Sequence, residues 1–243
     1  MLSKINLEGR RAVVTGAGGG IGRAIALRLA ESGMKVALVG RDAQMLVRTA
    51  ALTGRPLDML VLPVDLTAPR GIEDILRILT GHFKGLDVLV NNAGIAINKP
   101  FEETTLEEYD RIMAINARAP FELTRRCLPL LRQSDIPTII NIGSVVSHKG
   151  YVRQSAYAAS KHALLGWTRA LAREVAPEGI RVHMLSPGGV FTDLVREVRP
   201  DLTEDGMIAP EEIAELAAYL IEHRANGVID EIQIHRAGKE PFA

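Results

Sequence analysis

The chain has 243 residues, and 47% of them are hydrophobic, which is enough to bury a large core. Basic and acidic side chains balance at 29 each, so the net charge is zero and indicates neither a nucleic-acid partner nor a membrane surface. The single cysteine, Cys127, excludes an internal disulfide and fits a reducing compartment. No signal peptide is recognised and no apolar run reaches the ~18 residues that span a bilayer, so we expect a cytoplasmic protein.

A glycine-rich turn joins the first expected strand, residues 11–15, to a helix that runs to about residue 32. Its glycines have the spacing Gly-x-x-x-Gly-x-Gly, at Gly16, Gly20 and Gly22. Without side chains, the backbone can approach a pyrophosphate closely, and the first N–H groups of the helix point at it. This turn therefore predicts a dinucleotide phosphate site rather than only a flexible connection. The residues assigned to that site are Gly16, Gly18, Gly19, Gly20, Ile21 and Gly22.

The second expected strand, residues 35–39, ends at Gly40-Arg41-Asp42. An acidic side chain at this strand end would bind the ribose 2′-hydroxyl of NAD, but Gly40 has none. Arg41 offers a guanidinium where the 2′-phosphate of NADP would lie. The sequence therefore favours NADP (NADPH) as the cofactor, with NAD as the alternative if Arg41 is only a solvated surface residue.

Strands and helices alternate through the rest of the chain, without an internal repeat, a low-complexity tract or a linker. Further strands are expected over residues 57–64, 86–90, 137–142, 179–185 and 228–234, and helices over residues 43–52, 72–83, 104–133, 155–176 and 211–224. This order predicts an α/β fold: one domain, residues 1–243, built on a Rossmann-type doubly wound parallel sheet of about seven strands with helices on both faces. The carboxyl ends of such strands face the ligand, which places Asp65 and the turn at residues 91–94 on the binding side.

Tyr157 and Lys161 are four residues apart and therefore lie on one face of the expected helix. An ammonium beside a phenol favours the phenolate, so we expect Lys161 to lower the Tyr157 pKa from about 10 and make it an acid or base near neutral pH. Lys161 can also donate hydrogen bonds to the hydroxyls of a bound ribose. Asn116 lies among apolar residues in mid-helix, where a buried amide needs partners, either as a structural hydrogen-bonder or as part of the site.

Several motifs occur together in one order: the glycine turn, Asn91-Asn92-Ala93-Gly94, Asn116, Ser144, Tyr157-x-x-x-Lys161, and Pro187-Gly188 with Thr192. In order and spacing they resemble those of the short-chain dehydrogenase/reductase family, including its 3-oxoacyl-[acyl-carrier-protein] reductases. The resemblance runs from about residue 7 to residue 234. It implies a nicotinamide-dependent oxidoreductase that interconverts a ketone and a secondary alcohol.

The resemblance also implies a role for each matching residue. Tyr157 would be the general acid/base, and Ser144 would hydrogen-bond the substrate oxygen. Lys161 would hold the nicotinamide ribose and lower the Tyr157 pKa, while Asn116 would position a water that relays protons to Lys161. Asp65 would meet the adenine. With Arg41 and the glycine turn, the expected cofactor-binding residues are Asp65, Leu66, Asn92, Ala93, Gly94, Tyr157, Lys161, Pro187, Gly188, Val190 and Thr192.

The substrate side is predicted from residues 190–209, which we expect to form a lid. Phe191, Leu194, Val195 and Val198 recur at helical spacing before Pro200, as in a short helix with one apolar face. Such a face over the nicotinamide would suit a partly apolar substrate. An ordinary packed helix is the alternative.

A free small molecule is expected to be the substrate, rather than an acyl group on a carrier protein. Where the carrier-dependent reductases of this family place two arginines, this chain has Asp135 and Glu178, which would repel an acidic carrier. A 3-oxoacyl-carrier reductase, an NAD-linked secondary alcohol dehydrogenase and a non-catalytic cofactor-sensing regulator remain alternatives. The resemblance implies a homodimer or homotetramer. The six histidines form no His-x-x-x-His pair, so no metal site is expected.

Overall fold

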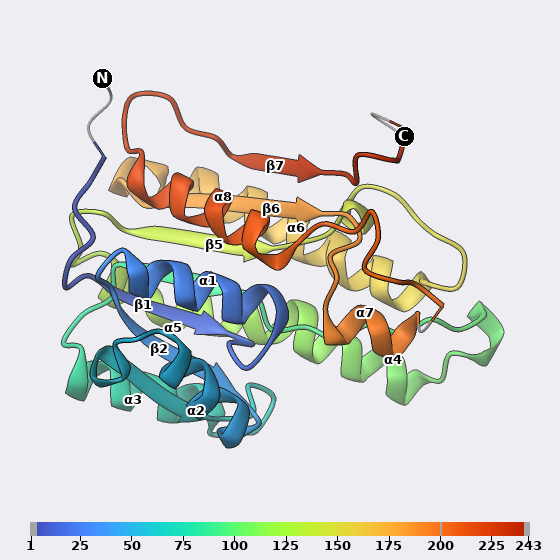
Figure 1. Cartoon of the computed structure of the whole chain (residues 1–243), viewed down its shortest axis with the longest axis horizontal. Coiled ribbons are helices and arrows are strands. Elements are labelled where there is room, and N and C mark those ends of the chain that lie inside the picture. Colours follow the sequence, from blue (N-terminus) through green and yellow to red (C-terminus); the bar gives the residue numbers. More distant parts are fainter. Residues whose placement is uncertain (1–3, 200, 241–243) are drawn as a thin grey trace.

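The computed structural model of the protein describes residues 4–199 and 201–240. Its strands are β1 (Arg11–Thr15), β2 (Lys35–Gly40), β3 (Met59–Pro63), β4 (Val88–Asn91), β5 (Thr138–Ile142), β6 (Arg181–Pro187) and β7 (Glu231–Ile234). They form one sheet in the order β3-β2-β1-β4-β5-β6-β7, and every neighbouring pair is parallel (Figure 1). The predicted fold class, a doubly wound parallel sheet, is therefore confirmed.

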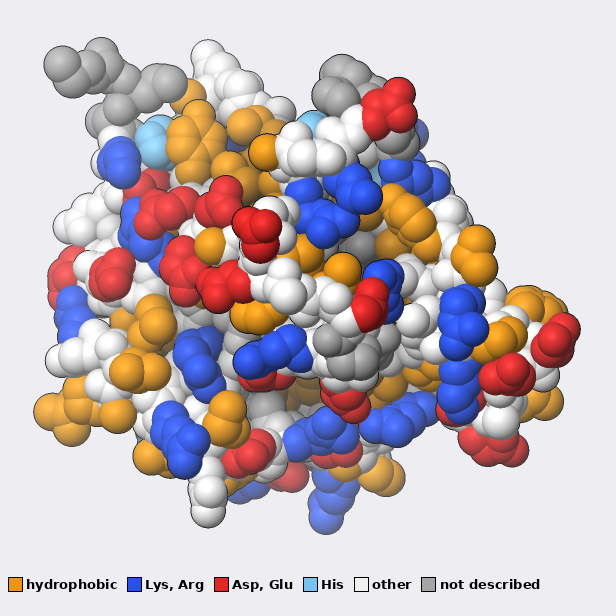
Figure 2. Space-filling model, turned by 45° about the vertical axis from the view of Figure 1, so that its right-hand side comes forward, with side chains coloured by type: hydrophobic (Ala, Val, Ile, Leu, Met, Phe, Trp, Pro, Cys, Tyr) orange, Lys and Arg blue, Asp and Glu red, His pale blue; other side chains and the backbone are white. Residues whose placement is uncertain are grey.

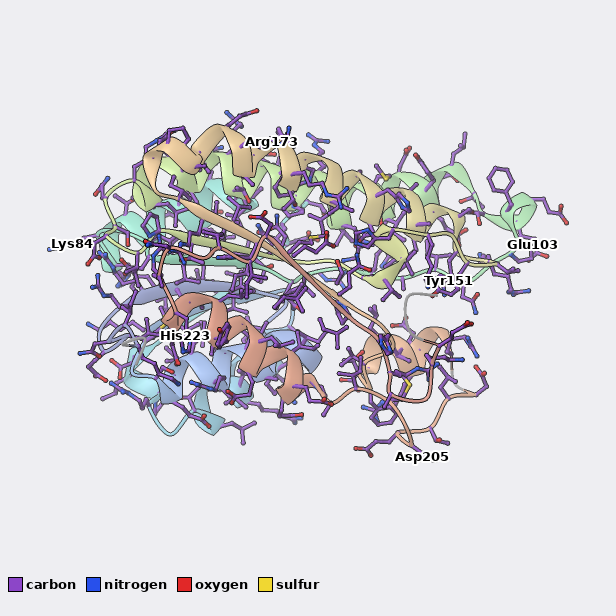
Figure 3. All side chains as sticks on the ribbon, turned by 90° about the horizontal axis from the view of Figure 1, so that it is seen from above. Lys84, Glu103, Tyr151, Arg173, Asp205 and His223 are labelled. Atoms are coloured by element: carbon purple, nitrogen blue, oxygen red, sulfur yellow. The ribbon has the colours of Figure 1, made fainter. Side chains whose placement is uncertain are left out.

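Helices cover both faces of this sheet, as the view from above shows (Figure 3). Apolar residues of α1 (Gly20–Glu31), α2 (Ala43–Leu52) and α8 (Pro210–Glu222) pack into one core cluster. The second cluster contains apolar residues of α3 (Gly71–His82), α5 (Ala119–Leu131) and α6 (Ser155–Val175). The inner strands are buried on both sides by these layers, which explains why their sequences are mostly apolar, whereas the edge strands β3 and β7 are largely half-buried. Cys127 lies in the second cluster, where burial raises its thiol pKa to about 12 and makes it unreactive.

The helix expected over residues 104–133 consists of three consecutive pieces: α4 (Leu106–Met113), a π-helical turn (Ala114–Arg118) and α5. A capping box begins it, because Thr105 and Glu108 exchange side-chain and backbone hydrogen bonds of 3.2 and 3.1 Å. The π-helical turn contains Asn116. Such turns inside α-helices are frequent at functional sites, and the sequence pattern did not predict this one.

The third and seventh strands are each three residues shorter than expected, and the fourth and fifth are each one residue shorter. The third strand begins at Met59 because Pro56–Asp58 forms a 3-10 turn, in which proline is well tolerated. The seventh begins at Glu231, where pairing with Met184 of β6 starts. The sixth instead extends to Pro187, so the predicted Pro187-Gly188 segment continues directly from a strand.

Three segments extend past the carboxyl ends of the strands: residues 95–104, residues 145–154, and residues 190–209 with α7 (Asp193–Val198). Figure 3 shows Glu103, Tyr151 and Asp205, one from each segment, at the same end of the molecule. The ligand-binding end is thus flanked by connections rather than by sheet. Within the described ranges, no helix is long and apolar enough to cross a membrane.

Candidate active site

The glycine turn follows β1 at the point where the strand order reverses, between β1 and β4. Gly16 and Gly20 have φ angles of +67° and +49°, in the left-handed region that favours glycine. A Cβ atom on Gly22 would collide with the Gly16 carbonyl and the Asn92 side-chain amide. Three positions of the turn therefore require glycine. The N–H groups of the first turn of α1 have no intrahelical acceptor and suit an anion.

Side chains from three other elements hold this turn in place. The Thr15 hydroxyl accepts hydrogen bonds from the backbone N–H groups of Asn92 (2.9 Å) and Ala93 (3.0 Å), which join β1 to the turn after β4. Thr49 of α2 donates to the Ala17 carbonyl over 2.9 Å, and Arg23 donates to Thr49 and to the Gly18 carbonyl. No sequence motif marks Arg23 or Thr49 as a site residue, because their role depends on how α1 and α2 pack together. The turn is thus preorganised by the fold.

A cleft of about 480 Å³ opens beside the glycine turn. It is lined by Gly16, Gly18, Gly19, Gly40, Arg41, Asp42, Met45, Leu46 and Asp193. Gly40 contributes no carboxylate, and Asp42 is engaged as the N-cap of α2, accepting from the N–H groups of Gln44 (2.9 Å) and Met45 (3.1 Å). The exposed Arg41 side chain is the cation at this strand end. These residues fit the adenosine and phosphate half of a nicotinamide dinucleotide.

Asp65 and Leu66 follow β3, on the same side of the sheet. One Asp65 oxygen, Oδ1, accepts hydrogen bonds from the Thr67 hydroxyl (2.7 Å) and the Thr67 backbone N–H (2.8 Å). These bonds lower the pKa of the Asp65 carboxyl, against a smaller opposing effect of burial. Asp65 is therefore ionised at neutral pH and held in one orientation by Thr67.

Ser144 and Tyr157 are brought together at the end of β5 and the first turn of α6. Ser144 is 8% exposed, and its hydroxyl accepts from the Val146 N–H over 3.2 Å. A hydrogen bond also joins the Ser144 and Tyr157 hydroxyls. Burial raises the Tyr157 pKa to about 12, and the bond with Ser144 only partly offsets this. Tyr157 is therefore protonated at neutral pH.

Lys161 lies on the same face of α6 as Tyr157, as its spacing predicted, with Nζ 5.8 Å from the centre of the phenol ring. The expectation that it lowers the Tyr157 pKa is wrong in this structure. The ammonium donates to the Ile142 carbonyl over 2.9 Å rather than to the phenol oxygen. Burial, which the sequence does not reveal, dominates both groups and lowers the Lys161 pKa to about 8.

Replacing Lys161 by Met should stabilise the cofactor-free protein at pH 7 by about 2 kcal/mol. Lowering its pKa from 10.5 to about 8 means that burying the charge costs about 3 kcal/mol below pH 8. The variant avoids that cost but loses the hydrogen bond to Ile142, which reduces its gain in stability by about 1 kcal/mol. The unfolded chain retains the proton between pH 8 and 10.5, whereas the folded chain releases it, so wild-type stability rises across this window and the gain shrinks.

Urea unfolding of both proteins at pH 7, 9 and 10.5 measures this difference. Lys35→Met, at an exposed position of β2, is the matched control and should change stability little at any of these pH values. A Lys161→Met protein less stable than wild type at pH 7 would show that the buried ammonium is a net stabilising group.

The Asn116 side chain makes three hydrogen bonds to two residues. Its Oδ1 accepts from the Ile95 N–H over 2.9 Å, and its Nδ2 donates to the Ile95 carbonyl (2.9 Å) and to the Ser160 hydroxyl (3.0 Å). The amide thereby ties the π-helical turn both to the segment after β4 and to α6, next to Lys161. The prediction that Asn116 needs partners is confirmed. Its role in positioning a water stays a prediction.

The segment after β6 approaches the glycine turn. Gly188 donates its N–H to the Ile234 carbonyl over 2.7 Å, and Val190 is buried and pairs with Ile208. Thr192 caps α7 by accepting from the Val195 N–H over 3.4 Å, and its methyl group lies where a side chain on Gly20 would be. The expected lid therefore rests on the glycine turn.

The apolar lid face is described only in part. Phe191, Leu194 and Val195 are half-buried, whereas the Val198 side chain and Pro200 lie outside the described residues. Asp193 was not predicted as a site residue, yet it lies against Gly19 and lines the cleft. No local pattern marks it, because the contact joins positions far apart in the sequence. In the part of the chain that the structure describes, no group of three His, Cys, Asp or Glu residues could hold a metal ion.

The doubly wound sheet, its glycine turn and the adjoining cleft define a dinucleotide-binding protein. A family model described as short chain dehydrogenase matches residues 10–203, and the chain belongs to that family. It is an oxidoreductase family whose members act on hydroxyl and keto groups. The predicted family is thus confirmed.

Named relatives of the chain differ in what they act on. It is 36% identical over 207 residues to a D-beta-hydroxybutyrate dehydrogenase of Rhizobium meliloti (strain 1021), covering 84% of this chain and 80% of the relative. It is 35% identical over 232 residues to the 3-oxoacyl-[acyl-carrier-protein] reductase FabG of Vibrio cholerae serotype O1, covering 91% and 93%.

Solved structures that align with this chain include one complexed with NADH and one complexed with NADP. A 3-ketoacyl-(acyl-carrier-protein) reductase from Brucella melitensis complexed with NADH aligns with a TM-score of 0.84 at 31% identity, covering 96% of this chain and 98% of that one. A short chain dehydrogenase from Shigella flexneri 2a complexed with NADP aligns with a TM-score of 0.85 at 28% identity, covering 95% and 98%.

Proposed function

We propose that the protein is an NADP(H)-dependent oxidoreductase that reduces the carbonyl group of a small, partly apolar molecule to a secondary alcohol, or catalyses the reverse. The observation that carries this proposal is the position of Lys161 Nζ, 5.8 Å from the centre of the Tyr157 ring, with Ser144 beside the same phenol. Lys161 lies on the same helical face, at the same end of the sheet as the glycine turn. A sensor that only binds its cofactor has no need for this group of side chains.

In the proposed reaction, a bound nicotinamide supplies a hydride to the carbonyl carbon, and negative charge develops on the oxygen. Ser144 and Tyr157 donate hydrogen bonds to that oxygen, and Tyr157 gives it a proton. A phenol pKa of about 12 suits this direction, because the proton is present throughout the neutral range. Lys161 holds the nicotinamide ribose and, through a water positioned by Asn116, returns a proton to Tyr157.

The remaining site residues bind the cofactor in this proposal. The glycine turn, from Gly16 to Gly22, holds the pyrophosphate, while Asp65 and Leu66 meet the adenine. Asn92, Ala93 and Gly94 flank the adenosine ribose, and Asn92 also donates to the Thr15 carbonyl over 2.9 Å. The segment with Pro187, Gly188, Val190 and Thr192 holds the nicotinamide.

Arg41→Ala should weaken NADPH binding by about 10- to 100-fold and leave NADH binding unchanged. A charge-assisted hydrogen bond to the 2′-phosphate contributes about 1.5–3 kcal/mol, and NADH has no such phosphate. Fluorescence titration of wild type and variant with both nucleotides measures the difference. Arg48→Ala, an exposed position of α2 that does not line the cleft, is the control. Equal NADPH affinity in Arg41→Ala would favour an NAD-linked dehydrogenase.

The structure modifies the argument against a carrier protein. Asp135 forms an ion pair with Arg10, and Glu178 forms one with Arg132 over 2.5 Å. Each pair is locally neutral, so repulsion of an acidic carrier is weaker than the sequence suggests, but neither arginine is free to bind one. A free small molecule is still preferred, and the name of the Rhizobium relative, a hydroxybutyrate dehydrogenase, agrees with that preference. Reduction of a carrier-bound 3-oxoacyl group is the second candidate, supported by the FabG relative.

Loss of NADPH absorbance over a panel of ketones tests the proposed function. Turnover of free ketones, together with oxidation of the matching secondary alcohols by NADP, would support it. Tight NADPH binding without turnover of any free or carrier-bound carbonyl would instead favour a regulator that senses the cofactor. We further propose a single domain over residues 1–243 with a lid at 190–209, a cytoplasmic location, and a homodimer or homotetramer.

A further inference from the structure

Arg236 lies beside Gly189 and Met207 and has no acidic partner among the described residues. It follows β7, and its Nη1 donates to the Met207 sulfur over 3.1 Å. A thioether is a weak acceptor, while a guanidinium has five N–H donors in a rigid fork. Among residues 4–199 and 201–240, no carboxylate lies within ion-pair distance of Arg236. Most of its hydrogen-bonding capacity is therefore available to a ligand.

The sheet register places Arg236 level with the nicotinamide segment. Pro187 of β6 pairs with Ile234 of β7, so two residues further along each chain Gly189 lies beside Arg236. Ser144 is likewise level with Pro187, because Ile142 pairs with Leu185. The backbone of Arg236 therefore lies two strand spacings, about 10 Å, across the sheet from the line of β5, which Ser144 follows.

Gly189 creates the space into which this side chain extends. A Cβ atom at Gly189 would lie 2.9 Å from the Met207 methyl carbon and 3.5 Å from Arg236 Cδ. Met207 and Arg236 together thus occupy the position that a side chain at residue 189 would fill. Met207 belongs to the expected lid, and the Ile208 N–H donates to the Gly189 carbonyl over 3.1 Å. The guanidinium therefore lies between the nicotinamide segment, the lid and the C-terminal segment.

The other arginines of these segments have internal partners, whereas Glu197, Glu204 and Asp205 of the lid are exposed. Arg196 pairs with Asp193, and Arg199 pairs with Asp201 over 2.6 Å. Glu231 of β7 accepts from His148 (2.5 Å), Ser186 (2.9 Å) and Arg169 (3.3 Å). Figure 2 shows Lys and Arg side chains interspersed with Asp and Glu side chains over this face of the molecule. Arg236 is therefore the arginine of these described segments that remains available to an anion.

We propose that Arg236 binds the carboxylate of the substrate, so that the substrate is an oxo acid or the corresponding hydroxy acid. The half-buried methionine beside the guanidinium suits a short apolar chain between the two polar groups. The planar fork of arginine matches a carboxylate with two parallel hydrogen bonds, which also orients the carbonyl toward Ser144 and Tyr157. This inference rests on the proposed function and adds the substrate class to it.

Binding of an unreactive acid tests the inference without turnover. Calorimetric titration of the full-length protein, saturated with NADP, with pentanoate and with pentanamide compares a carboxylate with its neutral analogue. Wild type should bind pentanoate at least tenfold more tightly. In Arg236→Gln this preference should disappear, and Arg236→Lys should restore part of it. Arg77→Gln, on the exposed side of α3, should behave as wild type.

Turnover of 4-oxopentanoate and of its methyl ester provides the second measurement. The ratio of kcat/KM for acid over ester should fall at least tenfold in Arg236→Gln. An unchanged ratio and unchanged pentanoate affinity would overturn the inference, as would a wild type that prefers the ester. The inference would also be overturned if Arg236→Gln changed the molar mass in size-exclusion chromatography but retained the preference for acids. That result would assign Arg236 to a contact between copies of the chain.

The two proposals fail in different ways. Tyr157→Phe should retain the preference for pentanoate while losing turnover, because Arg236 does not act through the phenol. A wild type that binds pentanoate through Arg236 but reduces no carbonyl would refute the proposed function and leave the anion site standing. A wild type that reduces neutral ketones without any preference for acids would support the proposed function and refute the carboxylate site at Arg236.

Discussion

Tyr157→Phe should lower the rate of carbonyl reduction at neutral pH by at least about 100-fold, because proton donation by a positioned acid contributes ~10²–10⁴-fold to a rate. The substitution removes one oxygen and leaves the ring, which is packed at the start of α6 beside Ser144. Ser144 then remains as the single side-chain donor to the developing charge, and no group delivers the proton. The variant isolates proton transfer from the shape of the site.

The measurement is the loss of NADPH absorbance with a ketone that the wild type reduces, at saturating substrate. Fluorescence titration should show NADPH affinity within about threefold of wild type, since the phosphate and adenosine contacts are on other elements. Tyr219→Phe is the matched control, because Tyr219 of α8 stacks on His223, away from the site. Near-normal turnover by Tyr157→Phe would eliminate the phenol as the acid.

The glycine turn was predictable because its cause is local. Strand, glycines and helix follow one another within about twenty residues, and the φ angles of Gly16 and Gly20 are those that the pattern implies. The seven strands were predictable for a related reason, since β-strands buried on both faces are short apolar runs. Arg41 illustrates the limit of such reasoning: its position at a strand end is local, whereas the engagement of Asp42 as a helix cap needed the structure.

The pKa of Tyr157 shows what spacing alone cannot provide. A separation of four residues places Lys161 near the phenol, but it does not tell how much water either group keeps. Burial moves the Tyr157 pKa up to about 12 and the Lys161 pKa down to about 8, so each neutral form is favoured. The Lys161 ammonium also donates to the Ile142 carbonyl, at the end of a strand nineteen residues earlier in the chain.

Long-range ion pairs likewise could not be predicted from the sequence. Asp135 was interpreted as a surface charge facing a partner, yet it pairs with Arg10, which lies 125 residues earlier. The π-helical turn at Asn116 has no periodic signal, because it adds a single residue to an otherwise helical pattern. Both features depend on which elements the fold brings together.

Of the acidic residues discussed, Asp87 should cause the largest loss of stability when it is replaced. It precedes β4, its side chain is completely buried, and it accepts four hydrogen bonds from two residues. Arg11 donates through its backbone N–H (2.8 Å), Nε (2.8 Å) and Nη2 (3.0 Å), and the Ser134 hydroxyl donates over 2.6 Å. Burial acts to raise the Asp87 pKa, but these bonds outweigh it and hold the pKa below its ordinary value.

Asp87→Ala should therefore lower the free energy of unfolding by about 3–5 kcal/mol, because it leaves the Arg11 guanidinium partly buried without its acceptor. The carboxylate is ionised in the folded chain to a lower pH than in the unfolded chain. Its contribution is complete above pH 4 and is lost as the pH falls through the folded-state pKa, so the difference from wild type should shrink on acidification. Urea unfolding at pH 7 and pH 3 measures both values.

Asp74→Ala gives the contrast, because Asp74 makes an exposed ion pair with Arg77 on α3 and should cost less than about 1 kcal/mol. Asp87 lies at the amino end of β4, whereas the glycine turn, Ser144 and Tyr157 lie at the carboxyl end of the sheet. The folded fraction of Asp87→Ala should therefore reduce ketones with the same KM as wild type. A raised KM at equal folded fraction would mean that the two ends of the sheet are coupled, and a loss below about 1 kcal/mol would mean that Arg11 finds another acceptor.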